Sequence, residues 1–172
     1  MHRQIRDRFS VTLRTAAGHK FRGEFGDPGA FPRPRKEIQN LPHRALVTGR
    51  ASVAEAGDLV RHHGVEYLLC GQHVLQGTKR FLAVEVNAHL QWKRLTEIVD
   101  PVTKMKKDDQ EVVLDPALPV TIEPQRSLEE KKFTKPQERL FTTADVRLGD
   151  EIGGKKVLHL DELFGLKLVE VA

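Results

Sequence analysis

Residues 81–92 read Phe81-Leu82-Ala83-Val84-Glu85-Val86-Asn87-Ala88-His89-Leu90-Gln91-Trp92. If this stretch is a strand, its even positions form an apolar face and its odd positions a mainly polar one, because side chains alternate with period two. A helical period fits badly, since Glu85, His89 and Trp92 would share one face. At about 3.3 Å per residue the run reaches about 35 Å, longer than most strands. The sequence therefore predicts an extended β-ribbon or small barrel.

The same alternation predicts strands on both sides of this run. Residues 9–13 and 21–25 alternate around Gly18 and are expected to pair as a hairpin. After the run, a polar loop at residues 100–110 is expected to form a hairpin tip, and the chain returns through residues 111–114. These features predict a long β-hairpin from about 79 to 114. Its tip would carry Lys104, Lys106 and Lys107, which are predicted to contact DNA or an acidic partner; a charged, solvated loop is the alternative.

Residues 27–43 break the periodicity and contain four prolines. Proline removes a backbone donor and biases the preceding residue toward extended conformations, so this segment is expected to be an extended arm. A structureless connection of this length is uncommon inside a compact domain unless it is functional. Three apolar residues are predicted to pack against a neighbouring subunit: Phe31, Ile38 and Leu41. Three basic residues are predicted to contact DNA or an acidic partner: Arg33, Arg35 and Lys36.

Two segments match the helix capping box, and both have an alternative reading. Residues 52–55 fit the start of a short helix, but a turn at residues 56–60 is favoured because Gly57-Asp58 falls in the second helical turn. Residues 125–140 contain the second match and fit a short helix or a charged linker. Gly149-Asp150 repeats the Gly-Asp turn ahead of another predicted strand, and two such turns are too few to indicate a repeat.

Length and charge limit the class of protein. The chain has 172 residues, 39% hydrophobic and 30% charged, so a single soluble β-rich domain spanning 1–172 is expected. The first fifty residues hold eleven Lys or Arg against four Asp or Glu, within a net charge of +4. This basic third fits three settings: nucleic acid, an acidic neighbouring subunit, or ordinary solvated surface.

The sequence shows no arrangement typical of catalysis. Because His62 and His63 are adjacent, they are expected to point to opposite faces of a strand or to diverge in a turn. No cysteine pair is present, and neither a nucleophile elbow nor a phosphate-binding glycine loop is found. We therefore expect no enzyme activity, no metal and no cofactor. Cys70 is expected to be a small core residue. No apolar run is long enough to span a bilayer, and the first residues lack a secretory signal, so no membrane association is expected.

A resemblance to a known family rests on four short stretches. These are Ala56-Gly57-Asp58-Leu59-Val60, Gly64-Val65-Glu66-Tyr67-Leu68-Leu69, Arg80-Phe81-Leu82-Ala83-Val84 and Trp92-Lys93-Arg94. Together they resemble the head-closure, or stopper, proteins of tailed bacteriophages, over roughly residues 50–100. In that family a Gly-Asp turn leads into a strand containing Gly-x-x-Tyr, and a hairpin partner ends in basic and aromatic residues.

The resemblance implies a β-barrel protomer that assembles into a homo-oligomeric ring in the phage neck. Such a ring lies between the capsid portal and the tail, belongs to the virion, and retains and then passes the packaged DNA. The chain departs from small stoppers in its length, its proline-rich arm and its segment 127–172, so a collar or another neck or tail component stays open. Neighbouring neck, portal or tail proteins, and DNA without sequence specificity, are the expected partners. The alternative is a nucleic-acid-binding β-barrel module without catalytic activity.

Overall fold

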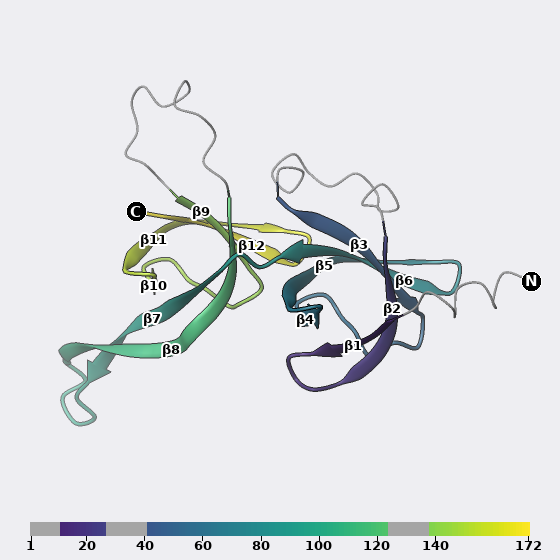
Figure 1. Cartoon of the computed structure of the whole chain (residues 1–172). Coiled ribbons are helices and arrows are strands. Elements are labelled where there is room, and N and C mark those ends of the chain that lie inside the picture. Colours follow the sequence, from purple (N-terminus) through teal and green to yellow (C-terminus); the bar gives the residue numbers. More distant parts are fainter. Residues whose placement is uncertain (1–10, 27–40, 124–137) are drawn as a thin grey trace, which may run out of the picture. The chain divides into compact units, whose positions relative to one another are not determined.

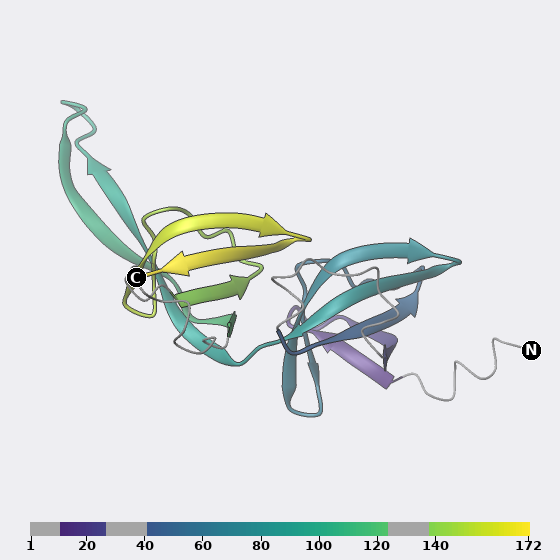
Figure 2. The ribbon, with the colours of Figure 1, turned by 90° about the horizontal axis from the view of Figure 1, so that it is seen from above.

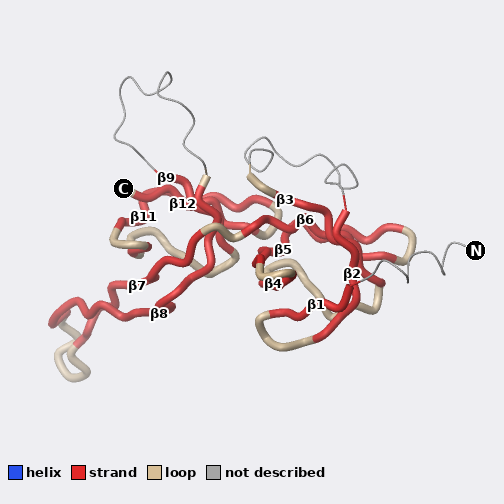
Figure 3. The backbone as a smooth tube through the Cα atoms, in the orientation of Figure 1, coloured by secondary structure: helices blue, strands red, loops and turns tan. Residues whose placement is uncertain are grey.

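The computed structural model describes residues 11–26, 41–123 and 138–172, with the side chains at 98–99 and 106–109 excluded. Figure 3 shows only strands and loops within these ranges. The mainly β fold predicted from the alternation is therefore confirmed. The sequence predicts one β-rich domain, whereas the chain divides into two compact units. One comprises residues 1–86 with 162–166, and the other residues 87–161 with 167–172.

The first unit contains a closed six-stranded antiparallel barrel, coloured purple to teal in Figure 1. Its strands are β1 (Val11–Thr15), β2 (Lys20–Gly26), β3 (His43–Gly49), β4 (Leu59–His62), β5 (Val65–Leu75) and β6 (Thr78–Glu85). They close in the order β1-β2-β3-β6-β5-β4. The predicted N-terminal hairpin is confirmed from residue 11 onward, with Leu13 opposite Phe21. Both side chains belong to the barrel core, together with Leu46, Tyr67 and Phe81.

The second unit also contains a closed barrel. Its strands are β7 (Ala88–Val99), β8 (Lys106–Ile122), β9 (Glu138–Thr142), β10 (Glu151–Ile152), β11 (Lys155–Leu163) and β12 (Leu166–Val171). They close in the order β7-β8-β9-β12-β11-β10. The core of this barrel includes Leu118, Val120, Leu140, Ile152 and Val169.

The two barrels share one topology. Numbered from the first strand of each barrel, both orders read 1-2-3-6-5-4, so that β7 to β12 match β1 to β6 in sequence order. Val60 of β4 pairs with Thr15, and Ile152 of β10 pairs with Trp92. Val60 and Ile152 are both fully buried. The chain is thus an internal repeat at the level of topology, although two Gly-Asp turns alone did not indicate one.

The two Gly-Asp turns occupy the matched position ahead of β4 and β10, and they are built alike. In the first, the Glu55 amide donates to Asp58 Oδ2 at 2.9 Å and the Asp58 amide donates to the Glu55 carbonyl at 3.2 Å. In the second, Arg147 and Asp150 form the same two bonds at 2.9 and 3.2 Å. Gly57 and Gly149 have φ of 100° and 86°, a region that glycine enters without steric cost. The turn predicted at residues 56–60 is therefore confirmed, and the alternative short helix starting at residues 52–55 is not formed.

The continuous strand expected over residues 81–92 is wrong. β6 ends at Glu85 and β7 begins at Ala88, and the chain passes from one unit to the other at residues 86–87. The faces also differ from the expectation: Phe81 and Ala83 face the barrel core, and Leu82 is fully buried as well. A long hairpin is present, but β7 and β8 form it and it begins at Ala88, not near residue 79.

Candidate functional site

The candidate site is the part of the β7–β8 hairpin that continues beyond the second barrel. The matching β1–β2 hairpin turns back at residues 16–19, directly after Thr15. Trp92 holds the position of Thr15, and from there β7 runs on to Val99 while β8 returns from Lys106. Residues 93–113 are called the arm below. Figures 1 and 2 both show this ribbon projecting from the rest of its unit.

The arm exposes an unusual share of apolar side chains. The described part of the chain has eleven exposed large hydrophobic residues, and the arm with the residue after it carries five of them. These are Leu95, Val102, Met105, Val113 and Leu114. Leu95 and Val113 lie on one face of the ribbon, because Leu95 is opposite Glu111 and Lys93 is opposite Val113. Scattered exposed hydrophobics need no explanation, but a cluster on a projecting element is typical of an interaction surface.

The turn at the end of the arm is defined by Asp100. Its Oδ1 accepts bonds from the amides of Val102 and Thr103 at 2.8 and 3.0 Å, and its own amide donates to the Met105 carbonyl at 3.0 Å. The two amide bonds lower the pKa of Asp100, since they stabilise its carboxylate form. The predicted loop at 100–110 is shorter than expected, because β8 already begins at Lys106.

The arm is anchored at its root by Asp150. Arg94 Nε donates to Asp150 Oδ1 at 2.8 Å, while Trp92 Nε1 and the Arg94 terminal nitrogen both donate to Oδ2 at 2.8 Å. The Arg147 amide adds a bond of 2.9 Å to the same oxygen. The guanidinium of Arg94 also lies 5.4 Å from the centre of the Trp92 ring. A bidentate pair between an arginine and a carboxylate fixes the orientation of the two side chains as well as the distance between them.

The electrostatics of the root follow from burial and bonding. Asp150 is 2% exposed, and burial alone would raise its pKa. The bonds from Arg94, from the Arg147 amide and from Trp92 outweigh burial and hold the pKa below its ordinary range. The carboxylate therefore stays ionised and holds the first residues of the arm against the barrel. The matched Asp58 of the first barrel keeps the amide bond but has neither side-chain donor, because Thr15 and Ala17 stand where Trp92 and Arg94 do.

The structure places few of the predicted site residues on this arm. Lys104 is exposed in the turn with φ of 58°, and its amide bonds the Asp100 carbonyl. Lys106 and Lys107 lie at the start of β8, and their side chains are outside the described part. Phe31, Ile38, Arg33, Arg35 and Lys36 also fall outside the described residues.

Leu41 is described, and it corrects one expectation. Its side chain is 3% exposed within the chain itself, so it is not available for packing against a neighbouring subunit. The adjacent Pro42 carbonyl accepts a bond from the Glu85 amide at 2.9 Å, which ties this segment to the end of β6. Among the described residues of the extended segment predicted at 27–43, Leu41 is therefore buried.

Groups with potential chemistry are sparse in the described ranges. No three His, Cys, Asp or Glu side chains there are grouped so that they could hold a metal ion. His62 and His63 do not diverge as expected, because their ring centres lie 4.1 Å apart, and His62 stacks on Phe25 at 5.0 Å. Cys70 is fully buried, as predicted, and burial raises the pKa of its thiol to about 12. Within the described residues, no helix is long and apolar enough to cross a bilayer.

The root was not predicted from the sequence, although each half of it carried a signal. Trp92 and Arg94 stood out as a basic and aromatic end to a strand, and Asp150 as part of a turn. They are 56 to 58 residues apart, and no spacing rule joins them. Only the closure of the second barrel, which pairs β10 with β7, brings them together.

Comparison of the chain with protein-family models, curated proteins and solved structures finds no match.

Proposed function

We propose that this chain is a structural protein that assembles into a ring in the neck of a tailed bacteriophage. In this role it joins the capsid portal to the tail and lets packaged DNA be retained and passed. It works by self-association, without catalysis, and the arm docks on a neighbouring copy of the chain. The observation that carries the proposal is the arm itself, a ribbon with exposed apolar side chains that leaves its barrel.

The energetics of the arm support a docking role. An isolated two-stranded ribbon is marginally stable in water, and three or more strands or a packed face are needed for independent stability. β7 and β8 have 12 and 17 residues, beyond the usual strand length. Covering Leu95 and Val113 would remove two half-exposed apolar side chains from water, at about 25 cal/mol per Å². A neighbouring subunit supplies such a cover.

The anchoring at Asp150 supports the same role. A flexible ribbon loses conformational freedom when it binds, and that loss subtracts from affinity. The buried carboxylate fixes the direction of Arg94 and therefore of the strand that follows it. The Asp100 turn similarly orders the opposite end. The resemblance to stopper proteins over roughly residues 50–100 provides the phage setting.

The experiment is a mass measurement on the purified full chain, with electron microscopy of the same sample. We expect a higher oligomer that appears as a ring. The double variant Leu95→Ser/Val113→Ser should shift the mass toward the monomer, while its free energy of unfolding changes by no more than about 0.5 kcal/mol. The matched control is Leu148→Ser/Leu158→Ser, which removes two exposed leucines of the second unit outside the arm. It should assemble like the unmodified chain.

A chain that stays monomeric up to high micromolar concentration would overturn the ring. Equal loss of assembly in both double variants would show that general surface hydrophobicity, and not the arm, drives association. An oligomer unaffected by the arm variant would place the interface elsewhere and remove the role assigned to the arm.

A further inference from the structure

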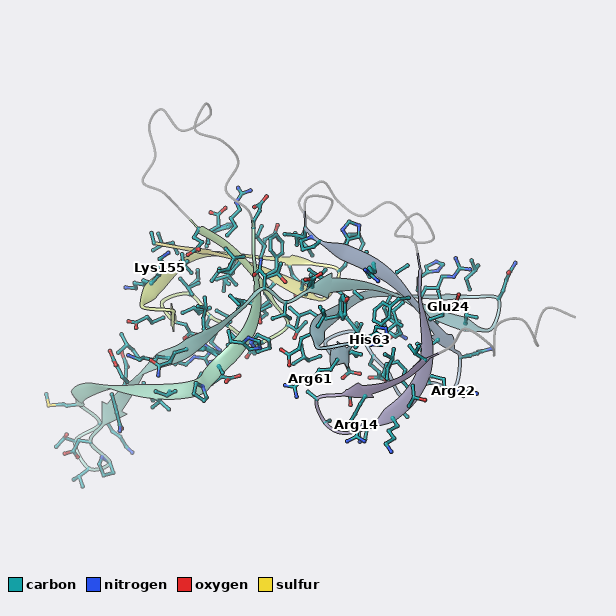
Figure 4. All side chains as sticks on the ribbon, viewed as in Figure 1. Arg14, Arg22, Glu24, Arg61, His63 and Lys155 are labelled. Atoms are coloured by element: carbon teal, nitrogen blue, oxygen red, sulfur yellow. The ribbon has the colours of Figure 1, made fainter. Side chains whose placement is uncertain are left out.

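A row of cations crosses the outside of the first barrel. Arg61 of β4 lies directly opposite Arg14 of β1, and Arg14 lies directly opposite Lys20 of β2. Arg22 follows two positions after Lys20 and so points to the same side. All four side chains are exposed. We refer to Arg14, Lys20, Arg22 and Arg61 as the basic row, and Figure 4 labels three of them on the solvent side of the barrel.

The basic row is poorly neutralised by the protein itself. Arg61 pairs with Glu66, and its side chain still remains 73% exposed. Within the described residues, no carboxylate forms an ion pair with the other three cations. Glu24 shares the outward face of β2 two residues beyond Arg22. Like charges directly opposite each other in a sheet are destabilising, so the fold gains nothing from this arrangement.

The second barrel shows that the topology does not require these charges. By register, the positions that match Arg14 and Arg61 hold Gln91 and Gly153, whose backbones bond at 2.9 Å. The position that matches Arg22 holds Pro119, and the irregular stretch of β8 opposite Gln91, which matches Lys20, holds Pro116 and Ala117. The same six-strand closure is therefore built with no cation at any of the four places. A charge cluster that costs stability and is absent from the matched barrel indicates an external partner.

We propose that the basic row binds the phosphate backbone of duplex DNA without reading its sequence. Adjacent strands lie about 4.8 Å apart, so Arg61, Arg14 and Lys20 span roughly 10 Å. Duplex DNA presents one negative charge per about 1.7 Å of its axis and is the densest common polyanion for such a row. The inference concerns a surface separate from the arm, and it holds whether or not the chain forms a ring.

The surroundings of the row favour duplex over single-stranded nucleic acid. Single-strand binding proteins stack bases on exposed aromatic rings. The outward positions of β1 and β2 next to the row are Thr12 and Glu24, and the aromatic Phe21 points into the core. Contacts to phosphates alone position a duplex but carry no sequence information. The uneven charge supports a polyanionic partner, since residues 1–86 hold fourteen Lys or Arg against eight Asp or Glu.

The test measures binding of the full chain to two unrelated 25-base-pair duplexes by fluorescence anisotropy, over a range of salt. Four phosphate contacts predict a slope of log K against log salt of about −3.6. The row variant Arg14→Gln/Lys20→Gln/Arg22→Gln/Arg61→Gln should lose at least about tenfold in affinity and most of that slope. It should remain folded, because removal of the opposed like charges offsets the loss of the Arg61–Glu66 ion pair.

The control removes the same number of charges elsewhere, in Arg44→Gln/Arg50→Gln/Arg147→Gln/Lys156→Gln. These four residues are also exposed. Each variant loses four positive charges, so both have the same net charge. The control should keep affinity within about threefold and keep the salt slope. Equal losses in both variants would reduce the effect to net charge and overturn the proposal. Unchanged DNA binding in the row variant would also overturn the proposal, and is the result expected if the row faces an acidic protein. A preference of the full chain for single-stranded DNA would overturn it as well.

Discussion

At the scale of single residues, the main difference between the two barrels lies in one matched aspartate. Asp58 and Asp150 make the same turn, with the same amide bonds within 0.1 Å. Asp150 alone of the two is buried and bonded by Trp92 and Arg94. A comparison of the two aspartates therefore separates the contribution of the turn to stability from the contribution of the arm root.

Replacement of each aspartate by asparagine measures that difference. Asp150→Asn should lower the free energy of unfolding by about 3 kcal/mol, because it leaves the Arg94 charge without its buried partner. Asp58→Asn should cost about 1 kcal/mol, since it weakens one turn bond. Urea unfolding of both variants gives the comparison. Similar losses in the two would mean that Arg94 and Trp92 add nothing beyond the turn.

His62 predicts a dependence of stability on pH. Burial lowers its pKa, and the nearby charges of His63 and Arg44 lower it further, so the folded state favours the neutral ring. An unfolded histidine binds its proton near pH 6.5. Below that pH the unfolded state therefore takes up more protons, and stability should fall as the pH drops through about 6.5 toward the lower folded pKa.

The variant His62→Gln should reduce this loss. Thermal unfolding at pH 7.5 and pH 5.5 would show a smaller drop in Tm for the variant than for the unmodified chain. His159→Gln, at an exposed position on β11, is the matched control and should leave the pH dependence as it was. An identical drop in all three proteins would exclude His62 as its source.

At the scale of elements, the arm is an addition to a hairpin that closes without it. The β1–β2 hairpin shows that the barrel needs only a short turn at this position. Arg94 lies opposite Val112, so residues 95–111 can be replaced by Asn-Gly, which favours the two-residue turn that joins antiparallel strands. The root on Asp150 would remain intact.

This excision should leave the second barrel folded, with a free energy of unfolding within about 1 kcal/mol of the unmodified chain. Circular dichroism and urea unfolding check the fold, and light scattering on the same sample should report the loss of self-association. Failure to fold would show that the ribbon contributes to the barrel core, contrary to the exposure of its side chains.

At the scale of the whole molecule, alternation predicted the strands but not their division between two barrels. β6 and β7 are separated by Val86 and Asn87. A gap of two residues preserves the period-two pattern, so Leu82 and Trp92 keep the same parity across it. Neither residue is glycine or proline, and the sequence therefore gave no breaking signal. Phe81 to Val84 are all buried, so β6 buries both of its faces and is not the half-buried strand that the alternation predicts.

The candidate site shows the same limit. Local patterns predicted a long hairpin with a polar tip, and the pairing of β7 with β8 confirms it, although it begins at Ala88 and has a shorter loop than expected. The basic row and the arm root did not follow, because each joins side chains from strands whose register is a tertiary property. The excess of positive charge in the first fifty residues includes Arg14, Lys20 and Arg22, but it does not single them out and does not include Arg61.

The shared topology also gives the molecule a second position at which a ribbon could be inserted. In the first barrel, the short turn at residues 16–19 lies at the position from which the arm extends in the second barrel. A copy of residues 93–113 grafted there would create a protomer with two prongs instead of one. If one prong joins each copy to the next, two would join it to several, and a closed assembly would become a branched gel.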